Sequence, residues 1–207
     1  MANLFKAANG KRSSEKDILL GKYTSARSLF LLVIVFTLIN MIIAIIGQDT
    51  YFLFSIYTPY LITFLGALWC GKMPEIYYQG EGAVEPLENT TLMWVMFAAA
   101  LIVVAIAFVL WLISKKPSTV KMTVILSLFV IDSVLMILLV GLNTAMVLDY
   151  IMHAYIIYSL AVGISAAARF NALGNTPEPI VTDSFNDVTL SRKLSAISGA
   201  AALLKAE

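Results

Sequence analysis

Apolar runs dominate the chain, and four of them are long enough to cross a membrane. A membrane-spanning helix needs about 20 mainly apolar residues, because about 30 Å of hydrocarbon is covered at about 1.5 Å per residue. Residues 28–47 and 91–113 contain no charged side chain, and residues 122–141 contain one acid. Residues 150–168 are less apolar but still long enough. The pattern therefore predicts four membrane-spanning helices.

A fifth apolar run, residues 51–71, differs from the other four in composition. It holds seven aromatic residues and a proline, Pro59, and only three residues separate it from the first run. Tyrosine and tryptophan prefer the boundary between bilayer and water. Proline removes a backbone donor and disfavours helix at the residue before it. We expect a break at Pro59 between two short segments, with the aromatic side chains packed on the outer ends of the spans.

The distribution of basic residues indicates whether this fifth run crosses. If it does not cross and the N-terminus is cytoplasmic, thirteen of the 14 Lys and Arg residues lie inside and only Lys72 lies outside. If it crosses, they divide evenly between the two sides. Cytoplasmic loops carry an excess of Lys and Arg. The sequence therefore predicts a multi-pass protein of the plasma membrane with both termini cytoplasmic and residues 51–71 as an interfacial or re-entrant element on the outer face.

The segments outside the spans complete the predicted architecture. Residues 1–27 form a basic cytoplasmic segment before a span that is not cleaved as a signal peptide. Residues 72–89 form an acidic outer loop. In the cytoplasmic tail, residues 169–207, apolar side chains spaced by three and four predict an amphipathic helix over about 187–205. The predicted fold class is all-α integral membrane: a four-transmembrane-helix bundle with these additions.

Composition excludes several classes of protein. The chain is 60% apolar and 13% charged, with a mean hydropathy of +0.87, whereas soluble domains are about 45–50% apolar and about 25% charged. A net charge of +1 gives no basic footprint for nucleic acid. Cys70 is the single cysteine, which excludes a disulfide scaffold. No nucleotide, metalloprotease or nucleophile motif is present, and we expect no cofactor and no metal site.

Asp132 is the clearest candidate for chemistry, because it lies in the middle of the third span. An ionisable group at that depth is costly and is therefore a candidate functional residue. Polar residues at similar depth are Thr37 and Asn40 on the first span, and Tyr158 and Ser159 on the fourth. Two interpretations stay open: a proton or cation site, or a hydrogen bond from Asp132 to Asn40, Tyr158 or Ser159 that holds the helices together.

Asp149 and His153 form a second candidate site at the outer start of the fourth span. Their spacing of four places them on one helix face, where a direct or water-bridged contact is expected. Together they could pass protons, sense pH, or hold a metal with a third ligand such as Asp49 or Glu75. A structural hydrogen bond between the two is the simpler alternative.

Three small residues of the fourth span, Ser159, Gly163 and Ala167, repeat at intervals of four. Such a stripe allows two helices to approach closely. It is expected to pack within the bundle or to form a dimer contact.

Several segments resemble small four-span membrane proteins of Gram-positive bacteria. The resemblance covers roughly residues 28–165 and is carried by GQDTYFLFSIYTPYLITFLG, CGKMPEIYY, FVIDSVLMILLVG and LDYIMHAYIIYSLAVG. It implies a bacterial plasma membrane and no particular activity.

Three functions are compatible with these features. The first is a non-enzymatic accessory, scaffold or sensor subunit that acts through helix–helix contacts with a protein partner or with itself. The second is a small ion- or proton-coupled transporter or channel that uses Asp132. The third is a membrane enzyme that uses the outer acids with His153. The lipid bilayer is the one partner that all three share, and the sequence leaves open whether there is a small-molecule ligand.

Overall fold

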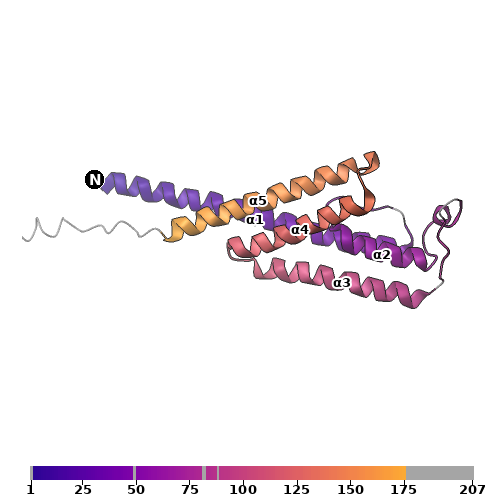
Figure 1. Cartoon of the computed structure of the whole chain (residues 1–207). Helices are drawn as coiled ribbons and strands as arrows, with labels where there is room; N and C mark the ends of the chain where they lie inside the picture. The colour runs from indigo at the N-terminus through magenta and orange to yellow at the C-terminus, as the bar shows by residue number, and fades with distance from the viewer. Residues whose placement is uncertain (1, 49, 81–82, 88, 176–207) are drawn as a thin grey trace, which may run out of the picture. The chain divides into compact units, whose positions relative to one another are not determined.

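The computed structural model describes residues 2–48, 50–80, 83–87 and 89–175 (Figure 1). The predicted tail helix at about 187–205 and the candidate Asp49 lie outside these residues. The described residues form α-helices and short 3-10 helices and contain no strand. The elements are α1 (Ala2–Ile46), α2 (Tyr57–Trp69), η1 (Glu75–Tyr78), α3 (Thr90–Ile113), α4 (Thr119–Val140), η2 (Thr144–Met146) and α5 (Val147–Asn175).

Four helices are long and apolar enough to cross a membrane, as predicted from the apolar runs. They correspond to Ser14–Ile46, Thr90–Ile113, Thr119–Val140 and Thr144–Gly174. The helix boundaries of α3 and α4 lie within three residues of the predicted spans. By contrast, α1 begins far before residue 28, because the polar and basic residues that precede the apolar run do not interrupt a helix.

Polar side chains cap the starts of α3 and α4. The side chain of Asn89 accepts hydrogen bonds from the backbone N–H groups of Thr91 and Leu92, at 3.1 and 3.2 Å. Ser118 accepts from the N–H of Lys121 at 3.5 Å. The first N–H groups of a helix have no partner within the helix, so these caps fix where each helix begins.

One end of the bundle is tied together where α3 turns into α4. The hydroxyl of Tyr23 on α1 donates to the carbonyl oxygens of Ser114 and Lys116, at 2.7 and 3.1 Å. The Arg27 guanidinium donates to the carbonyl of Trp111 and lies 4.2 Å from the centre of its ring. These contacts hold α1 against the last turn of α3. We call this the α3–α4 turn end, and the opposite end, where α1 stops and α3 starts, the η1 end.

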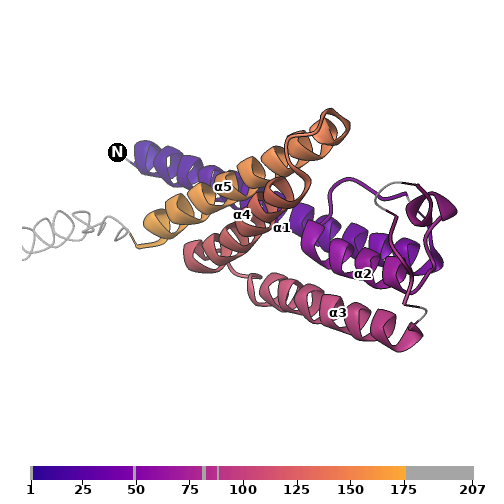
Figure 2. The same ribbon diagram turned by 45° about the vertical axis from the view of Figure 1, so that its right-hand side comes forward.

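The short helix α2 lies alongside α1 and α3 in both views (Figures 1 and 2). The chain leaves α1 at Gly47, which has φ +83°, and a Cβ there would collide with the carbonyl oxygen of Lys72, just beyond α2. Residues 47 and 72 therefore meet at the η1 end, so the chain between them runs into the bundle and returns. At Gly66, a Cβ would lie 3.1 Å from Met96, which shows how closely α2 approaches α3.

The predicted break at Pro59 is wrong. Residues 51–56 are not helical, and α2 is continuous from Tyr57 through Pro59 to Trp69. Proline is tolerated in the first helical turn, because its missing N–H would have no partner there. The 13 residues of α2 cover about 20 Å, which is short of the about 30 Å of a hydrocarbon core, so the count of long helices stays at four.

Candidate functional site

Two buried side chains of α1 hold the extended segment that precedes α2. The amide of Asn40 donates to the carbonyl of Phe52 at 2.8 Å and accepts from its N–H at 2.6 Å. The Thr37 hydroxyl accepts from the N–H of Ile56 at 2.8 Å and donates to the carbonyl of Val33 at 2.7 Å. Thr37 and Asn40 are fully buried. They satisfy backbone groups of a non-helical segment that would otherwise be costly inside the bundle.

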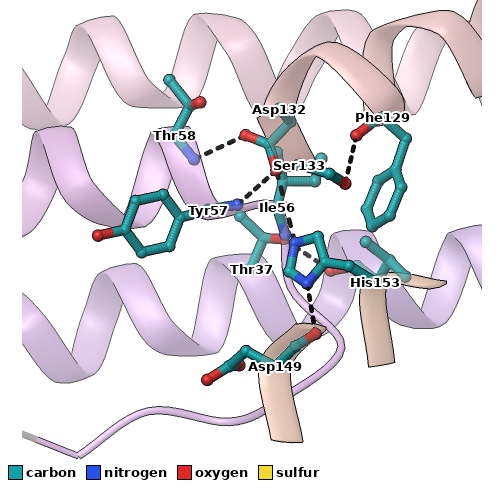
Figure 3. A network of polar contacts seen from close by, with 10 residues as sticks. Thr37, Ile56, Tyr57, Thr58, Phe129, Asp132, Ser133, Asp149 and His153 are labelled. Atoms are coloured by element: carbon teal, nitrogen blue, oxygen red, sulfur yellow. Dashed lines mark hydrogen bonds and ion pairs between the residues drawn. The ribbon is translucent and has the colours of Figure 1, made fainter. Parts of the chain in front are cut away.

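The carboxylate of Asp132 caps the start of α2 from the neighbouring helix α4. Its Oδ2 accepts from the N–H of Tyr57 and its Oδ1 accepts from the N–H of Thr58, both at 2.8 Å (Figure 3). The residue at the N-cap position, Ile56, supplies no side-chain acceptor. Because Pro59 has no N–H, the donors at the start of α2 are satisfied by Asp132 and Thr37 together.

The charge of Asp132 suits this place. A helix N-terminus carries the positive end of the helix dipole, which stabilises a carboxylate beside it. Asp132 is 5% exposed, and its two backbone donors offset part of the cost of burying a charge. Asp132 lies eight residues, or about 12 Å, before the end of α4, so α2 starts inside the bundle rather than at its end.

His153 on α5 lies against this carboxylate. Its Nδ1 is 2.9 Å from the backbone carbonyl of Asp149, and its ring stacks on Phe129 with 5.1 Å between ring centres. Its Nε2 lies 3.9 Å from Oδ2 of Asp132 (Figure 3) and has no hydrogen-bond partner. His153 is 5% exposed, so the unpartnered nitrogen faces the carboxylate in a buried environment.

The carboxylate of Asp149 is held by a residue of the extended segment. The hydroxyl of Tyr51 donates to Oδ2 of Asp149 and contacts the sulfur of Met146 at 3.4 Å. Burial, together with the neighbouring Asp149 carboxylate, raises the pKa of the Tyr51 hydroxyl far above its ordinary value. Tyr51 therefore stays a neutral donor, and it ties the extended segment to the start of α5.

Aromatic rings continue from this contact along α2. Tyr51 stacks on Tyr60, which also contacts Tyr57 and Phe64, and Phe64 meets the ring of Tyr77 near η1. Centre-to-centre distances in this row are 5.2–6.2 Å, within the range of favourable ring pairs. The row connects the buried start of α2 with the η1 end.

The expected hydrogen-bond partners of Asp132 were wrong. The structure pairs Asp132 with the backbone of α2 instead of Asn40, Tyr158 or Ser159. Tyr158 points away from the bundle and is 67% exposed. Asn40 and Thr37 lie near the site, but they bind the extended segment rather than Asp132.

The expected pairing of the Asp149 and His153 side chains was also wrong. Both residues lie on α5, whose helix is regular from Val147, but His153 binds the backbone carbonyl of Asp149 and its other nitrogen faces Asp132. Both are buried rather than open to water. Glu75 is exposed on η1 and bonds to Gln79. No group of three metal-ligating side chains occurs among the described residues.

The stripe of small residues on α5 packs inside the bundle. A Cβ on Gly163 would lie 2.7 Å from the Cβ of Ala26 on α1 and 3.4 Å from Met122 on α4. Ala167 is fully buried, and Ser159 is half-buried. The close contact between α5 and α1 therefore depends on the missing side chain at Gly163.

An apolar cavity of about 220 Å³ borders the site between α3 and α4. Asp132 and Thr58 line it on the side of α2, and Val103, Ile106 and Leu128 are among its apolar walls. These wall residues are also exposed on the surface of the bundle, so the cavity opens sideways rather than toward either end.

Comparisons with protein-family models, curated proteins and solved structures found no match to this chain. The resemblance to four-span membrane proteins of Gram-positive bacteria rests on the sequence segments quoted above. The function is therefore argued from the geometry of the site.

Proposed function

We propose that the protein is a non-enzymatic, multi-pass protein of the plasma membrane that acts as a sensor or accessory subunit, with α2 as its responsive element. In this proposal α1, α3, α4 and α5 cross the bilayer, both termini are cytoplasmic, and α2 enters from the outer face and returns to it. The observation that best supports this proposal is that polar side chains from α1 and α4 hold the start of α2 inside the bundle.

Insertion into a membrane is supported by the surface of α3 and α4. Large apolar side chains are exposed along both helices, including Trp94, Ile102, Val109 and Leu138. Soluble proteins rarely expose contiguous apolar patches larger than a few hundred Å². A helix that is apolar on all sides is typical of a membrane span or a protein core.

The orientation is supported by where basic residues gather in the bundle. Lys115 and Lys116 lie at the α3–α4 turn, which contacts α1 beside Lys22. Lys22 and Arg169 line one shallow pocket between α1 and α5. An excess of basic residues marks the cytoplasmic side, so the α3–α4 turn end is assigned to the cytoplasm and the η1 end to the outside.

A sensor or accessory role fits how α2 is held. Non-helical backbone at membrane depth is tolerated only where protein or water satisfies it, and here Asn40, Thr37 and Asp132 do so. Any shift of α1 or α4 therefore changes the support of α2, which reaches the outer face. Contacts with lipid or a partner on the exposed faces of α3 and α4 can be transmitted in this way.

Cross-linking in native membranes tests this role. A partner cross-linked at the exposed Ile102 position should be stoichiometric, and its yield should fall in Asp132→Asn. The matched control is Ser133→Ala, because the Ser133 hydroxyl donates to the Phe129 carbonyl of its own helix. A chain without any cross-linked partner, or a yield equal in both variants, would contradict the accessory role.

A second candidate function, a proton- or ion-coupled transporter, is favoured by one observation. The positive end of a half-helix and a buried carboxylate meet beside a cavity of about 220 Å³, and transporters place discontinuous helices at their binding sites. Purified protein in liposomes loaded with a pH-sensitive dye distinguishes the two: Asp132-dependent proton flux supports transport. The enzyme hypothesis gains no support, because Glu75 is exposed on η1 and bonds to Gln79, whereas His153 is buried beside Asp132.

A further inference from the structure

The hydrogen bond of His153 determines which ring nitrogen is bare when the ring is neutral. A backbone carbonyl can only accept, so the Nδ1 that faces the Asp149 carbonyl at 2.9 Å carries the hydrogen. In a neutral ring, Nε2 then carries a lone pair and no hydrogen. That lone pair faces the Asp132 carboxylate at 3.9 Å, with no other partner. Two acceptors therefore face each other in a buried space.

A proton on Nε2 removes this conflict. It converts the ring into a donor and gives it a positive charge beside the carboxylate. Asp132 is already an acceptor on both oxygens, for the N–H groups of Tyr57 and Thr58, so neither oxygen lacks a donor. The pair can therefore take up one more proton, and this proton binds at Nε2.

The charges around the pair also favour a cation there. Among the described residues, the contacts of Asp132 and Asp149 include no lysine or arginine. From α1 the site receives only the neutral Thr37 and Asn40, and the α3 walls of the adjoining cavity are apolar. The other titratable groups near the pair are Tyr57 of α2, which lies close to Asp132, Asp149 and Tyr150, and Asp149 of α5, which accepts from Tyr51 of the extended segment.

We propose that Asp132 and His153 form a proton-binding site, and that the bound proton locks the start of α2 to α4 and α5. Oδ2 of Asp132 accepts from Tyr57 and faces Nε2 of His153. With the proton bound, this one oxygen joins α2, α4 and α5. Without it, the facing lone pair and carboxylate repel and loosen the support of α2. The structural consequence rests on the proposed re-entrant position of α2, whereas proton binding does not.

In the proposed orientation, the outer face is the nearer source of the proton. His153 lies six residues, or about 9 Å, from the start of α5 at the η1 end. Binding takes one proton from water onto Nε2 and makes or breaks no other covalent bond. Histidine is the side chain whose ordinary titration range falls between about pH 5 and 8, so outer-face acidity is the natural input.

Nitrogen NMR of the histidine ring tests the binding step directly. His153 is the single histidine of the chain, so protein labelled with ¹⁵N-histidine and purified without a histidine tag gives signals from one ring. Above the titration we expect the tautomer with hydrogen on Nδ1, and below it the doubly protonated ring. A neutral ring with hydrogen on Nε2, or a ring that stays neutral down to pH 5, would overturn the proposal.

The Asp132→Asn variant tests the role of the carboxylate. The variant removes the charge 3.9 Å from Nε2, so the pH at which the ring gains its second proton should fall. Ser133→Ala, which leaves both groups in place, should leave it unchanged. An unchanged midpoint in Asp132→Asn would show that the carboxylate does not stabilise the proton.

Hydrogen exchange tests the link to α2. Protection of the Tyr57 and Thr58 amides, corrected for the intrinsic effect of pH on exchange, should rise at least tenfold on acidification through the NMR midpoint. It should stay constant in His153→Gln and in amides of α3. Constant protection in the parent, with a titrating ring, would refute the lock but keep the proton site. Placement of residues 48 and 72 on opposite membrane faces would refute the re-entrant helix and leave the NMR result intact.

Discussion

Removing the cap on α2 should destabilise the protein strongly. In Asp132→Ala, the N–H groups of Tyr57 and Thr58 lose the carboxylate that accepts both at 2.8 Å. A hydrogen bond to a charged group contributes about 1.5–3 kcal/mol. Two such bonds sum to about 3–6 kcal/mol. Because both contacts are only partly buried, we expect a loss in the lower part of this range, about 3–4 kcal/mol in the free energy of unfolding.

Two further variants provide reference values for this loss of stability. Asp132→Asn keeps one acceptor oxygen but turns an amide donor toward the second N–H, so its loss should be about half that of alanine. Ser133→Ala removes a neighbouring buried hydroxyl that donates to the Phe129 carbonyl within α4 at 2.8 Å. Its loss should stay at about 1 kcal/mol or less.

Equilibrium unfolding in mixed detergent micelles, followed by tryptophan fluorescence, measures these differences. Trp69 at the end of α2 makes the signal sensitive to that helix. The expected order of stability is parent, Ser133→Ala, Asp132→Asn, Asp132→Ala. Equal stability of Asp132→Ala and Ser133→Ala would refute the reasoning that the carboxylate holds α2.

Two glycine substitutions test the closest backbone approaches. Gly21→Ala is their shared control, because a Cβ at residue 21 meets nothing within 4 Å. This control substitution should be neutral or mildly stabilising. Gly163→Ala places a Cβ 2.7 Å from that of Ala26 and should lower unfolding stability by about 1–3 kcal/mol through overpacking; a stability equal to that of Gly21→Ala would contradict the α1–α5 contact. Gly47→Ala meets both a φ of +83° and the carbonyl of Lys72, so its thermal midpoint in detergent should fall by several degrees. An unchanged midpoint would show that residues 47 and 72 are not in contact.

The long helices could be predicted from the sequence because each contains a long run of mainly apolar residues. Asp132 could be singled out because it is the one acid inside such a run. Its partners could not be predicted, because they are backbone N–H groups of Tyr57 and Thr58, and every residue carries such groups. Only the position of α2 in space makes these two available.

Rules that consider only neighbouring residues in the sequence also failed where the outcome depends on the position of a residue within its helix. A proline in mid-run indicates a break, but Pro59 lies in the first turn of α2, where its missing N–H costs nothing. The spacing of Asp149 and His153 correctly places them on one helix face. However, a helix face does not determine side-chain direction, and the Asp149 carboxylate turns to Tyr51 instead.

The position of α2 relative to the membrane is tested most directly by labelling cysteines on either side of it. In a Cys70→Ser background, Gln48→Cys and Lys72→Cys place one exposed thiol before the extended segment and one after α2. With a membrane-impermeant maleimide on intact cells, both positions should be labelled from outside, while Lys116→Cys should be labelled only after the membrane is opened. Labelling of residue 48 from outside and residue 72 only from inside would mean that this segment crosses the membrane, and would contradict a re-entrant helix held by Asp132.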